Sequence, residues 1–293
     1  MAQIARNPYV AGNPVGDGPA YVGREDVLRA VLRVLRHEHQ NAIVLYGQRR
    51  IGKTSILQYL HAHLPEEGPY RPVYLDLQDK AALPLGRVLE DLAEAIAQAL
   101  GLPPPQTSPD PETAFRDLWL PAVLAALPTD SALVLLMDEF DVLADPKTHQ
   151  AANAFFPYLR GLLASDPERL KFEFVIGRNV GDMDNIALSV FKGTPAHRVS
   201  LLSREECERL VRLAQDNGTL AWSQAALDRV WELTSGHPFL TQQLCLHVWE
   251  RAYDEAPAAA PAVDADGVDG AVDEALEASR NTMEWLWDGL PPA

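Results

Sequence analysis

Residues 47–54 read Gly-Gln-Arg-Arg-Ile-Gly-Lys-Thr and fit the pattern G-x-x-x-x-G-K-[ST] of a phosphate-binding loop. The glycines let the backbone curl so that successive N–H groups point at phosphate oxygens, and a following helix adds the positive end of its dipole. Lys53 is expected to reach the β- and γ-phosphates, and the Thr54 hydroxyl to ligate Mg²⁺. The predicted nucleotide contacts are Gly47, Gln48, Arg49, Arg50, Ile51, Gly52, Lys53, Thr54 and Ser55.

The flanks of this loop favour the functional interpretation over a chance glycine turn that carries a surface lysine. The apolar run 42–46 before it suits a buried strand. After it, a helical spacing places four apolar side chains on one face, namely Ile56, Leu57, Leu60 and Leu64. The order of strand, loop and helix is the one that phosphate binding requires.

A second apolar run, residues 133–137, ends in two carboxylates. Asp138 is predicted to hold Mg²⁺, directly or through water, and Glu139 to polarise the attacking water as a general base. Many strands end in acids that only face solvent, but the place of this one after the phosphate loop favours a role in catalysis. Asp141 either caps the turn or orients Glu139.

The composition limits the class of protein. The chain has 293 residues, 47% of them hydrophobic, and no apolar run approaches the roughly 20 residues that span a bilayer. Its first residues have no apolar signal core. The two cysteines, Cys207 and Cys245, show no metal or redox spacing and are expected to be core thiols. A reducing cytoplasm is the simplest location.

The net charge of −16 argues against broad nonspecific binding to DNA, which depends on positive potential. The charge is uneven, because residues 251–293 hold 10 acidic and 2 basic side chains, a net of −8. Arg49 and Arg50 form a candidate basic patch within the loop itself. A nucleic-acid partner is therefore disfavoured but left open.

Strands and helices alternate up to residue 202, with strands expected at 42–46, 72–77, 132–138, 172–177 and 197–201. This alternation predicts an α/β fold in which a parallel sheet is sandwiched by helices, as in P-loop NTPases. We expect an extended arm over 1–20, rich in Pro and Gly, and a nucleotide-binding domain over 21–202.

After residue 202 the pattern is helical and predicts a lid domain over 203–254. Ser203 and Glu206 form a capping box, Ser223 can cap a second helix, and Pro238 suits the first turn of a third. Residues 255–293 are expected to be an acidic linker, mobile over 255–267, and the start of a further helical segment, for which a winged helix is one candidate. We expect the chain to be truncated there.

Five short motifs in this order resemble those of the STAND group of AAA+-like, ASCE P-loop ATPases. These signalling NTPases include bacterial regulators, prokaryotic defence sensors, and apoptotic and plant-resistance switches. The resemblance covers about residues 7–250. It rests on Val22-Gly23-Arg24-Glu25, the phosphate loop, Asp138-Glu139, Gly177-Arg178 and Ser235-Gly236-His237-Pro238-Phe239.

The resemblance implies further roles. Val22 and Arg24 would lie beside the adenine, Arg178 would sense the γ-phosphate in catalysis, and Pro238 would close over the base and report nucleotide state. The alternative is that Gly23-Arg24 simply starts a helix and that Pro238 only separates two helices. The helix after Pro238 has no arginine until Arg251, and a trans arginine finger is assigned to neither Arg160 nor Arg198. Both features depart from the arginine pattern of many AAA+ machines, and they favour a slow switch over fast turnover in a ring.

The leading hypothesis is thus a cytoplasmic ATPase of signalling or defence that couples ATP or ADP, with Mg²⁺, to lid movement and assembly. Partners would be the nucleotide and, through domains missing from this sequence, a second copy or another protein, with no membrane. The alternatives are an AAA+ ring ATPase that remodels or loads protein on DNA, and an inactive nucleotide-binding scaffold. Intact Lys53, Asp138 and Glu139 argue against the scaffold.

Overall fold

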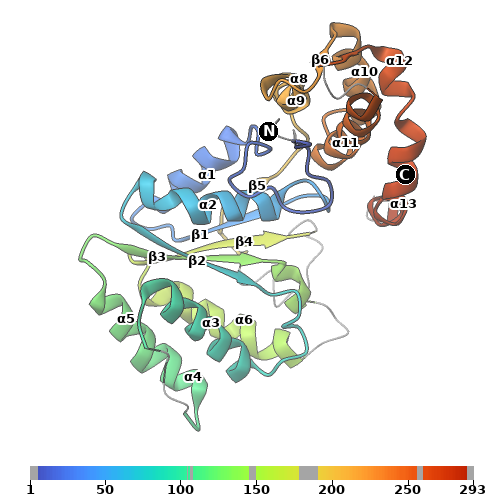
Figure 1. Ribbon diagram of the computed structural model, residues 1–293. Coiled ribbons are helices and arrows are strands. Elements are labelled where there is room, and N and C mark those ends of the chain that lie inside the picture. The colour runs from blue at the N-terminus through green and yellow to red at the C-terminus, as the bar shows by residue number, and fades with distance from the viewer. Residues whose placement is uncertain are drawn as a thin grey trace. The chain divides into compact units, whose positions relative to one another are not determined.

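The computed structural model describes residues 6–103, 105, 108–144, 150–177, 191–255 and 260–288. Its contacts divide the chain into two compact units (Figure 1). The α/β unit comprises Glu25–Gly47 and Ile56–Arg198; the helical unit comprises Met1–Arg24, Gln48–Ser55 and Val199–Ala293. This grouping places the phosphate loop with the helical unit, whereas the limits predicted from the sequence at residues 20, 202 and 254 stay predictions.

The α/β unit is built on one five-stranded sheet with the order β2-β3-β4-β1-β5. Every pair of neighbouring strands is parallel, as the alternation of strands and helices predicted. All residues of β3 and β4 are buried, which is the expected state of central strands covered on both faces. The strands are β1 (Ala42–Tyr46), β2 (Tyr70–Asp76), β3 (Ala132–Asp138), β4 (Leu170–Ile176) and β5 (Ala196–Arg198).

Helices cover both faces of this sheet, with α1 and α2 on one face and α3, α5 and α6 on the other (Figure 1). The predicted helix over 111–127 contains a π-helical stretch before α5. Pro121 in the first turn of α5 lacks the N–H that a regular helix needs, which explains the wider turn. The helices are α1 (Glu25–Leu35), α2 (Lys53–Glu67), α3 (Leu85–Leu100), α4 (Pro111–Thr113), the π-helix (Ala114–Trp119), α5 (Leu120–Ala126) and α6 (Gln150–Ser165).

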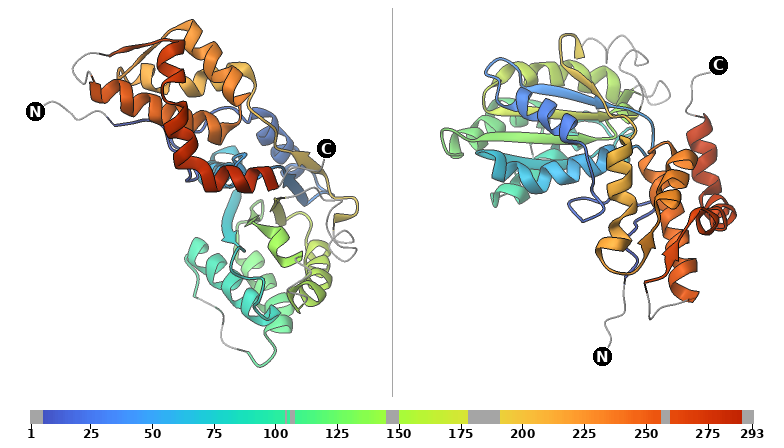
Figure 2. Two further views of the ribbon diagram at one scale, coloured as in Figure 1. Left: turned by 90° about the vertical axis from the view of Figure 1, so that its right-hand side faces the viewer. Right: turned by 90° about the horizontal axis from the view of Figure 1, so that it is seen from above.

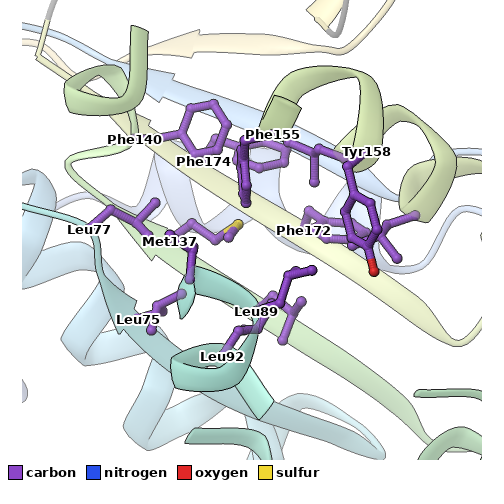
Figure 3. Packing of buried hydrophobic residues seen from close by; sticks show 14 of the residues in the cluster. Leu75, Leu77, Leu89, Leu92, Met137, Phe140, Phe155, Tyr158, Phe172 and Phe174 are labelled. Carbon is purple, nitrogen blue, oxygen red and sulfur yellow. The ribbon is translucent and has the colours of Figure 1, made fainter. Parts of the chain in front are cut away.

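The larger core lies between the sheet and helices α3, α5 and α6 (Figure 3). Phe140 is fully buried there, with its ring centroid 4.7 Å from that of Phe174 and 5.6 Å from that of Phe156. Phe140 opens a short 3-10 helix, Phe140–Ala144, directly after the acidic end of β3. The ring therefore fixes the backbone that carries Asp138 and Glu139.

Glu173 is an unusual residue of the opposite face of the sheet. It alternates with Phe172 and Phe174 along β4, so its side chain points away from the aromatic core. Its side chain is 0% exposed, and neither carboxyl oxygen has a hydrogen-bond partner among the described residues. Burial, and then the negative charge of Asp138, raise the pKa of Glu173 to about 8, so this carboxyl is mainly protonated at neutral pH.

The helical unit packs its helices around a second core (Figure 2). Its caps are those the sequence predicted: Ser203 and Glu206 form a reciprocal capping box, and the Ser223 hydroxyl accepts from the N–H of Ala226. The elements are α8 (Arg204–Val211), α9 (Leu213–Asp216), β6 (Ala221–Trp222), α10 (Gln224–Thr234), α11 (Pro238–Glu255), β7 (Ala262–Val263), α12 (Ala265–Asp269) and α13 (Val272–Asp288). No described helix is long and apolar enough to cross a membrane.

The N-terminal arm has no helix or strand over its described residues, but it is fixed to the helical unit. The side chain of Tyr9 is buried in the second core, and its hydroxyl donates to the carbonyl of Val211 at the end of α8. The N–H of Val10 donates to Oε1 of Gln242 on α11 (3.0 Å). The arm is thus part of the packed structure of this unit.

The prediction of a mobile linker over 255–267 is wrong for residues 260–267. These residues contain β7, which pairs in parallel with β6, and the start of α12, which Asp264 caps. Val263 and Val268 are buried in the second core. Pairing with β6 and the aspartate cap give the backbone N–H and C=O groups hydrogen-bond partners. The segment rich in Ala, Pro, Asp and Gly therefore forms a short strand and a short helix. The predicted helix after them is confirmed as α13, although Leu286 and Trp287 lie among residues whose side chains are not described.

We predict that Glu173→Leu raises the free energy of unfolding by about 1–3 kcal/mol near pH 7, because it removes an unpartnered buried polar group. The folded-state pKa of about 8 lies above the unfolded value of 4.5, so the wild type loses stability as pH rises between these values. Urea unfolding at about pH 5.5 and about pH 8.5 should therefore show a gap between variant and wild type that widens with pH.

The control for this prediction is Glu94→Gln, which changes an exposed carboxylate on α3. Its difference from the wild type should stay the same at both pH values. A Glu173→Leu protein that is less stable than the wild type at high pH would contradict the assignment of a costly buried carboxyl.

Candidate nucleotide-binding site

The phosphate loop has the predicted place between β1 and α2, and its backbone takes two left-handed conformations. Arg50 has φ +60° and Gly52 has φ +96°. A β-carbon at Gly52 would find only a guanidinium nitrogen of Arg24 nearby, at 3.8 Å, so the conformation and not crowding demands glycine there. Such a curled, open backbone is the cradle that a phosphate group needs.

Lys53 begins α2 and is 6% exposed. Its ammonium group donates to the carbonyl of Gln48 within the same loop, at 2.9 Å. A phosphate oxygen would offer the same ammonium a charged acceptor, which makes a stronger hydrogen bond than a neutral carbonyl. Thr54 follows in the first turn of α2 and is half-buried.

Two further side chains of the loop bond to the N-terminal arm within the helical unit. The buried Ser55 hydroxyl accepts from the N–H of Val15 at 3.1 Å. The guanidinium of Arg50 donates to the carbonyl of Gly12 and lies 5.7 Å from the centre of the Phe239 ring on α11. The arm and the start of α11 are therefore in direct contact with the loop.

Arg24 joins the loop to the segment before α8. Its buried guanidinium donates to the carbonyl of Ile51 (2.7 Å) and to that of Ser200 (2.5 Å). Its backbone N–H donates to Glu206 (3.2 Å), and a β-carbon at the preceding Gly23 would lie 2.3 Å from that carboxylate. The side chain thus positions the loop, while its predicted contact with adenine, like that of Val22, stays a prediction.

Next to Pro238, which begins α11 as predicted, lies a histidine that the sequence analysis did not select. His237 is 7% exposed, and neither ring nitrogen has a hydrogen-bond partner in the described part of the chain. Burial, and then the positive charge of Arg24, lower the pKa of His237 to about 4. The ring is consequently neutral near pH 7 and offers one donor and one acceptor. Only its burial and missing partners, which no sequence pattern shows, mark it as a candidate ligand contact.

In the α/β unit, Asp138 ends β3 and is 2% exposed. One carboxylate oxygen accepts from the N–H of Glu139 (3.0 Å), and the other accepts from the hydroxyl of Tyr74 on β2 (2.9 Å). Glu139 has φ +50°, a conformation that non-glycine residues seldom adopt and that occurs often at functional sites. Tyr74 is a second residue that the sequence analysis missed.

Asp141 ties this acidic turn to the next strand. Its buried carboxylate accepts from the N–H of Gly177 at the end of β4, at 2.9 Å. This bond connects the turn after β3 to the end of β4, and the predicted roles of Asp141 as a cap of the turn or as a residue that orients Glu139 stay predictions. Arg178, the predicted γ-phosphate sensor, lies outside the described residues. Arg160 and Arg198 are exposed, and their roles stay open.

The sheet register brings the functional ends of three strands of this unit to one edge. Tyr46 of β1 pairs with Ile176 of β4, and Phe174 of β4 pairs with Met137 of β3. Gly47, the first residue of the phosphate loop, and Asp138 therefore leave the sheet at the same side, separated only by β4. In open α/β sheets ligands bind at this carboxyl edge.

The predicted metal ligands, the Thr54 hydroxyl and the Asp138 carboxylate, are hard oxygen donors of the kind that Mg²⁺ prefers. Among the described residues no group of three or more His, Cys, Asp and Glu side chains could hold a metal ion by itself. Mg²⁺ binds one or two carboxylates together with phosphates and water, so a single buried carboxylate such as Asp138 suits it as a ligand. The residues present are thus compatible with the predicted cation.

A parallel five-stranded sheet, a glycine-flanked lysine loop after one strand and an acidic end on another define the α/β fold of the P-loop NTPases, here followed by a helical unit. Residues 36–177 match a family model described as an AAA domain. A search of curated proteins with this sequence found no match.

Similar solved structures show the same fold. The chain is similar to the Walker-type ATPase of Pyrococcus abyssi (TM-score 0.63, 13% identity, 93% of this chain and 76% of that one). It is also similar to domain III of the Thermotoga maritima replication initiation protein DnaA (0.55, 17%, 96% and 99%). A third is the RuvB Holliday junction branch migration motor of Thermotoga maritima (0.50, 14%, 88% and 70%). These similarities show the P-loop NTPase fold, and residues 36–177 resemble an AAA domain.

We predict that Lys53→Ala lowers the affinity for ATP by about 10- to 100-fold, the value of one hydrogen bond to a charged group. Calorimetry with ATP measures this change, and Lys192→Ala, which removes an exposed lysine of the α/β unit, should bind as the wild type does. Equal affinities of Lys53→Ala and the wild type, with both folded, would contradict the assignment of the loop.

Proposed function

We propose that this chain is a slowly hydrolysing ATP switch of the STAND type, in which the bound nucleotide controls the helical unit. The observation that carries the proposal is the contact of the phosphate loop, inside that unit, with both the arm and α11. Arg50 contacts Gly12 and Phe239, and Ser55 contacts Val15. A change of loop conformation on nucleotide exchange would act on these contacts directly.

The residues have separate tasks in this proposal. Backbone N–H groups of residues 47–54 and the Lys53 ammonium bind the phosphates, and Thr54 and Asp138 hold Mg²⁺. When bound, Mg²⁺ neutralises charge on the phosphate oxygens. Glu139 accepts a proton from the attacking water, and the fixed turn around Phe140 holds its backbone in place.

The roles of residues around the base and the γ-phosphate are part of the same proposal. Val22, Arg24 and Pro238 would contact the adenine, and Arg178 would sense the γ-phosphate. Arg24 already holds the loop through Ile51, so a contact with the nucleotide would add to this positioning task. The wider role, in cytoplasmic signalling or defence with self-association or a protein partner, rests on the STAND resemblance.

A second candidate function is a ring ATPase that works on DNA. The similarity to domain III of a replication initiation protein and to a branch migration motor favours it. Two observations weigh against it: the net charge of −16, and the lack of arginine in α11 before Arg251. We therefore keep the switch as the main proposal.

We predict that Glu139→Gln keeps ATP affinity but slows hydrolysis by about 10²- to 10⁴-fold, because the amide preserves the shape and cannot accept the proton. Steady-state turnover and calorimetry on the same preparation test both parts. Hydrolysis at the wild-type rate would show that Glu139 is not the base, and Asp141 would be tested next.

For the switch itself, we predict that hydrogen exchange over residues 48–55 and 238–245 differs between saturating ADP and a non-hydrolysable ATP analogue. Arg178→Ala should retain ADP affinity and lose the difference, since the γ-phosphate is the only chemical distinction between the two ligands. Identical exchange with both nucleotides would rule out the switch.

The same preparations separate the switch from the ring ATPase. Turnover of a switch should not respond to added DNA, and its mass in solution should depend on which nucleotide is bound. Turnover that rises with added DNA would favour the ring ATPase. Nucleotide binding without any turnover would favour an inactive nucleotide-binding scaffold.

A further inference from the structure

Tyr74 is the residue outside the predicted site whose contact bears most directly on the proposed chemistry. Its hydroxyl donates to Oδ2 of Asp138 at 2.9 Å, from the strand next to β3. The N–H of Glu139 donates to Oδ1 of the same carboxylate at 3.0 Å. Both oxygens of Asp138 are therefore held, one by a side chain and one by the backbone, so the plane of the carboxylate is fixed.

The register of β2 against β3 explains how this contact forms. Tyr74 pairs with Leu136, and Asp76 pairs with Asp138. Tyr74 and Asp138 point to the same face of the sheet, opposite the core that takes Val73 and Leu75. The phenol has to reach forward by two residues, about 6.6 Å, along the strand. Its length permits this reach, which a serine or threonine at the same position could not make.

The hydrogen bond that Tyr74 donates lies in partly buried, acidic surroundings. Burial raises the pKa of Tyr74 above its ordinary value, and the charges of Asp138, Asp76 and Glu139 raise it further. The acceptor carboxylate is 2% exposed, so little water competes for this hydrogen bond.

We propose that Tyr74 is a positioning residue that sets the affinity of this site for a divalent cation by holding the carboxylate of Asp138 in its ligating orientation. The inference rests on the proposed function, in which Asp138 is a ligand of Mg²⁺. Residues that orient a metal ligand through a hydrogen bond typically change metal affinity or activity by about 10- to 100-fold when removed. Tyr74 acts through Asp138 and has no part in proton transfer.

The alternative is that Tyr74 only contributes to packing and stability. Tyr74→Phe separates the two roles because it keeps the ring and removes one oxygen atom. Tyr158→Phe is a control in the same unit: Tyr158 is buried, whereas Tyr74 is half-buried, and the Tyr158 hydroxyl likewise donates one hydrogen bond, to the carbonyl of Glu112 at 2.7 Å. Loss of one such hydrogen bond should lower the urea midpoint of unfolding by a similar amount in either variant.

The test measures ADP and ATP affinity by calorimetry while Mg²⁺ is titrated, in parallel with urea unfolding. The Mg²⁺ concentration at which half of the gain in affinity is reached should rise about tenfold or more for Tyr74→Phe. For Tyr158→Phe it should equal that of the wild type, although both variants lose similar stability. Nucleotide affinity with a chelator present should be the same in all three proteins.

A Tyr74→Phe protein with the wild-type midpoint for Mg²⁺ would overturn the inference, and the proposed function would stand because the wild type still responds to the cation. A wild type whose nucleotide binding does not depend on Mg²⁺ would overturn the proposed metal site and this inference with it. A midpoint that shifts equally in both variants would also overturn it, since the effect would then follow stability alone.

Discussion

The parallel arrangement of β1, β4 and β3 is the constraint on which the α/β part of the candidate site depends. Parallel strands leave the sheet in the same direction, so residues that follow them in sequence meet at one edge regardless of how far apart they lie in the chain. Gly47, Asp138 and Gly177 are brought together in this way. Strand β4 lies in the middle of the sheet and is buried on both faces. Phe172 and Phe174 fill one face, and Glu173, whose raised pKa keeps it mainly protonated at neutral pH, lies on the other.

The phosphate loop depends on a different kind of support. Its pattern specifies only the glycines, the lysine and the threonine, yet the positions between them hold the loop in the helical unit. The carbonyl of Ile51 accepts from Arg24, and the side chain of Arg50 contacts the arm and Phe239. Residues that the motif leaves unspecified thus connect this loop to the arm, to Arg24 and to α11.

The order of strands and helices along the chain, the parallel sheet and the caps of α8 and α10 could be predicted from the sequence, because periodicity and capping are local. The predicted strands begin within two residues of the observed ones. Three features were not accessible. Tyr74 meets Asp138 through strand register, His237 is notable only for its missing partners, and β7 is two residues long. Each depends on contacts between segments distant in sequence, which propensity does not encode.

The anchoring of Tyr9 has a consequence for how the protein is made. The hydroxyl of Tyr9 bonds to the carbonyl of Val211, 202 residues later in the chain, and its ring lies in the core that α10 and α11 complete. The chain emerges from the ribosome with its N-terminus first, and contacts of such long separation form late. The sheet can therefore form before the helices that bind the N-terminal arm have been synthesised. The phosphate loop therefore acquires its support from Phe239 only after α11 has been synthesised, long after the loop itself and the strands of the sheet.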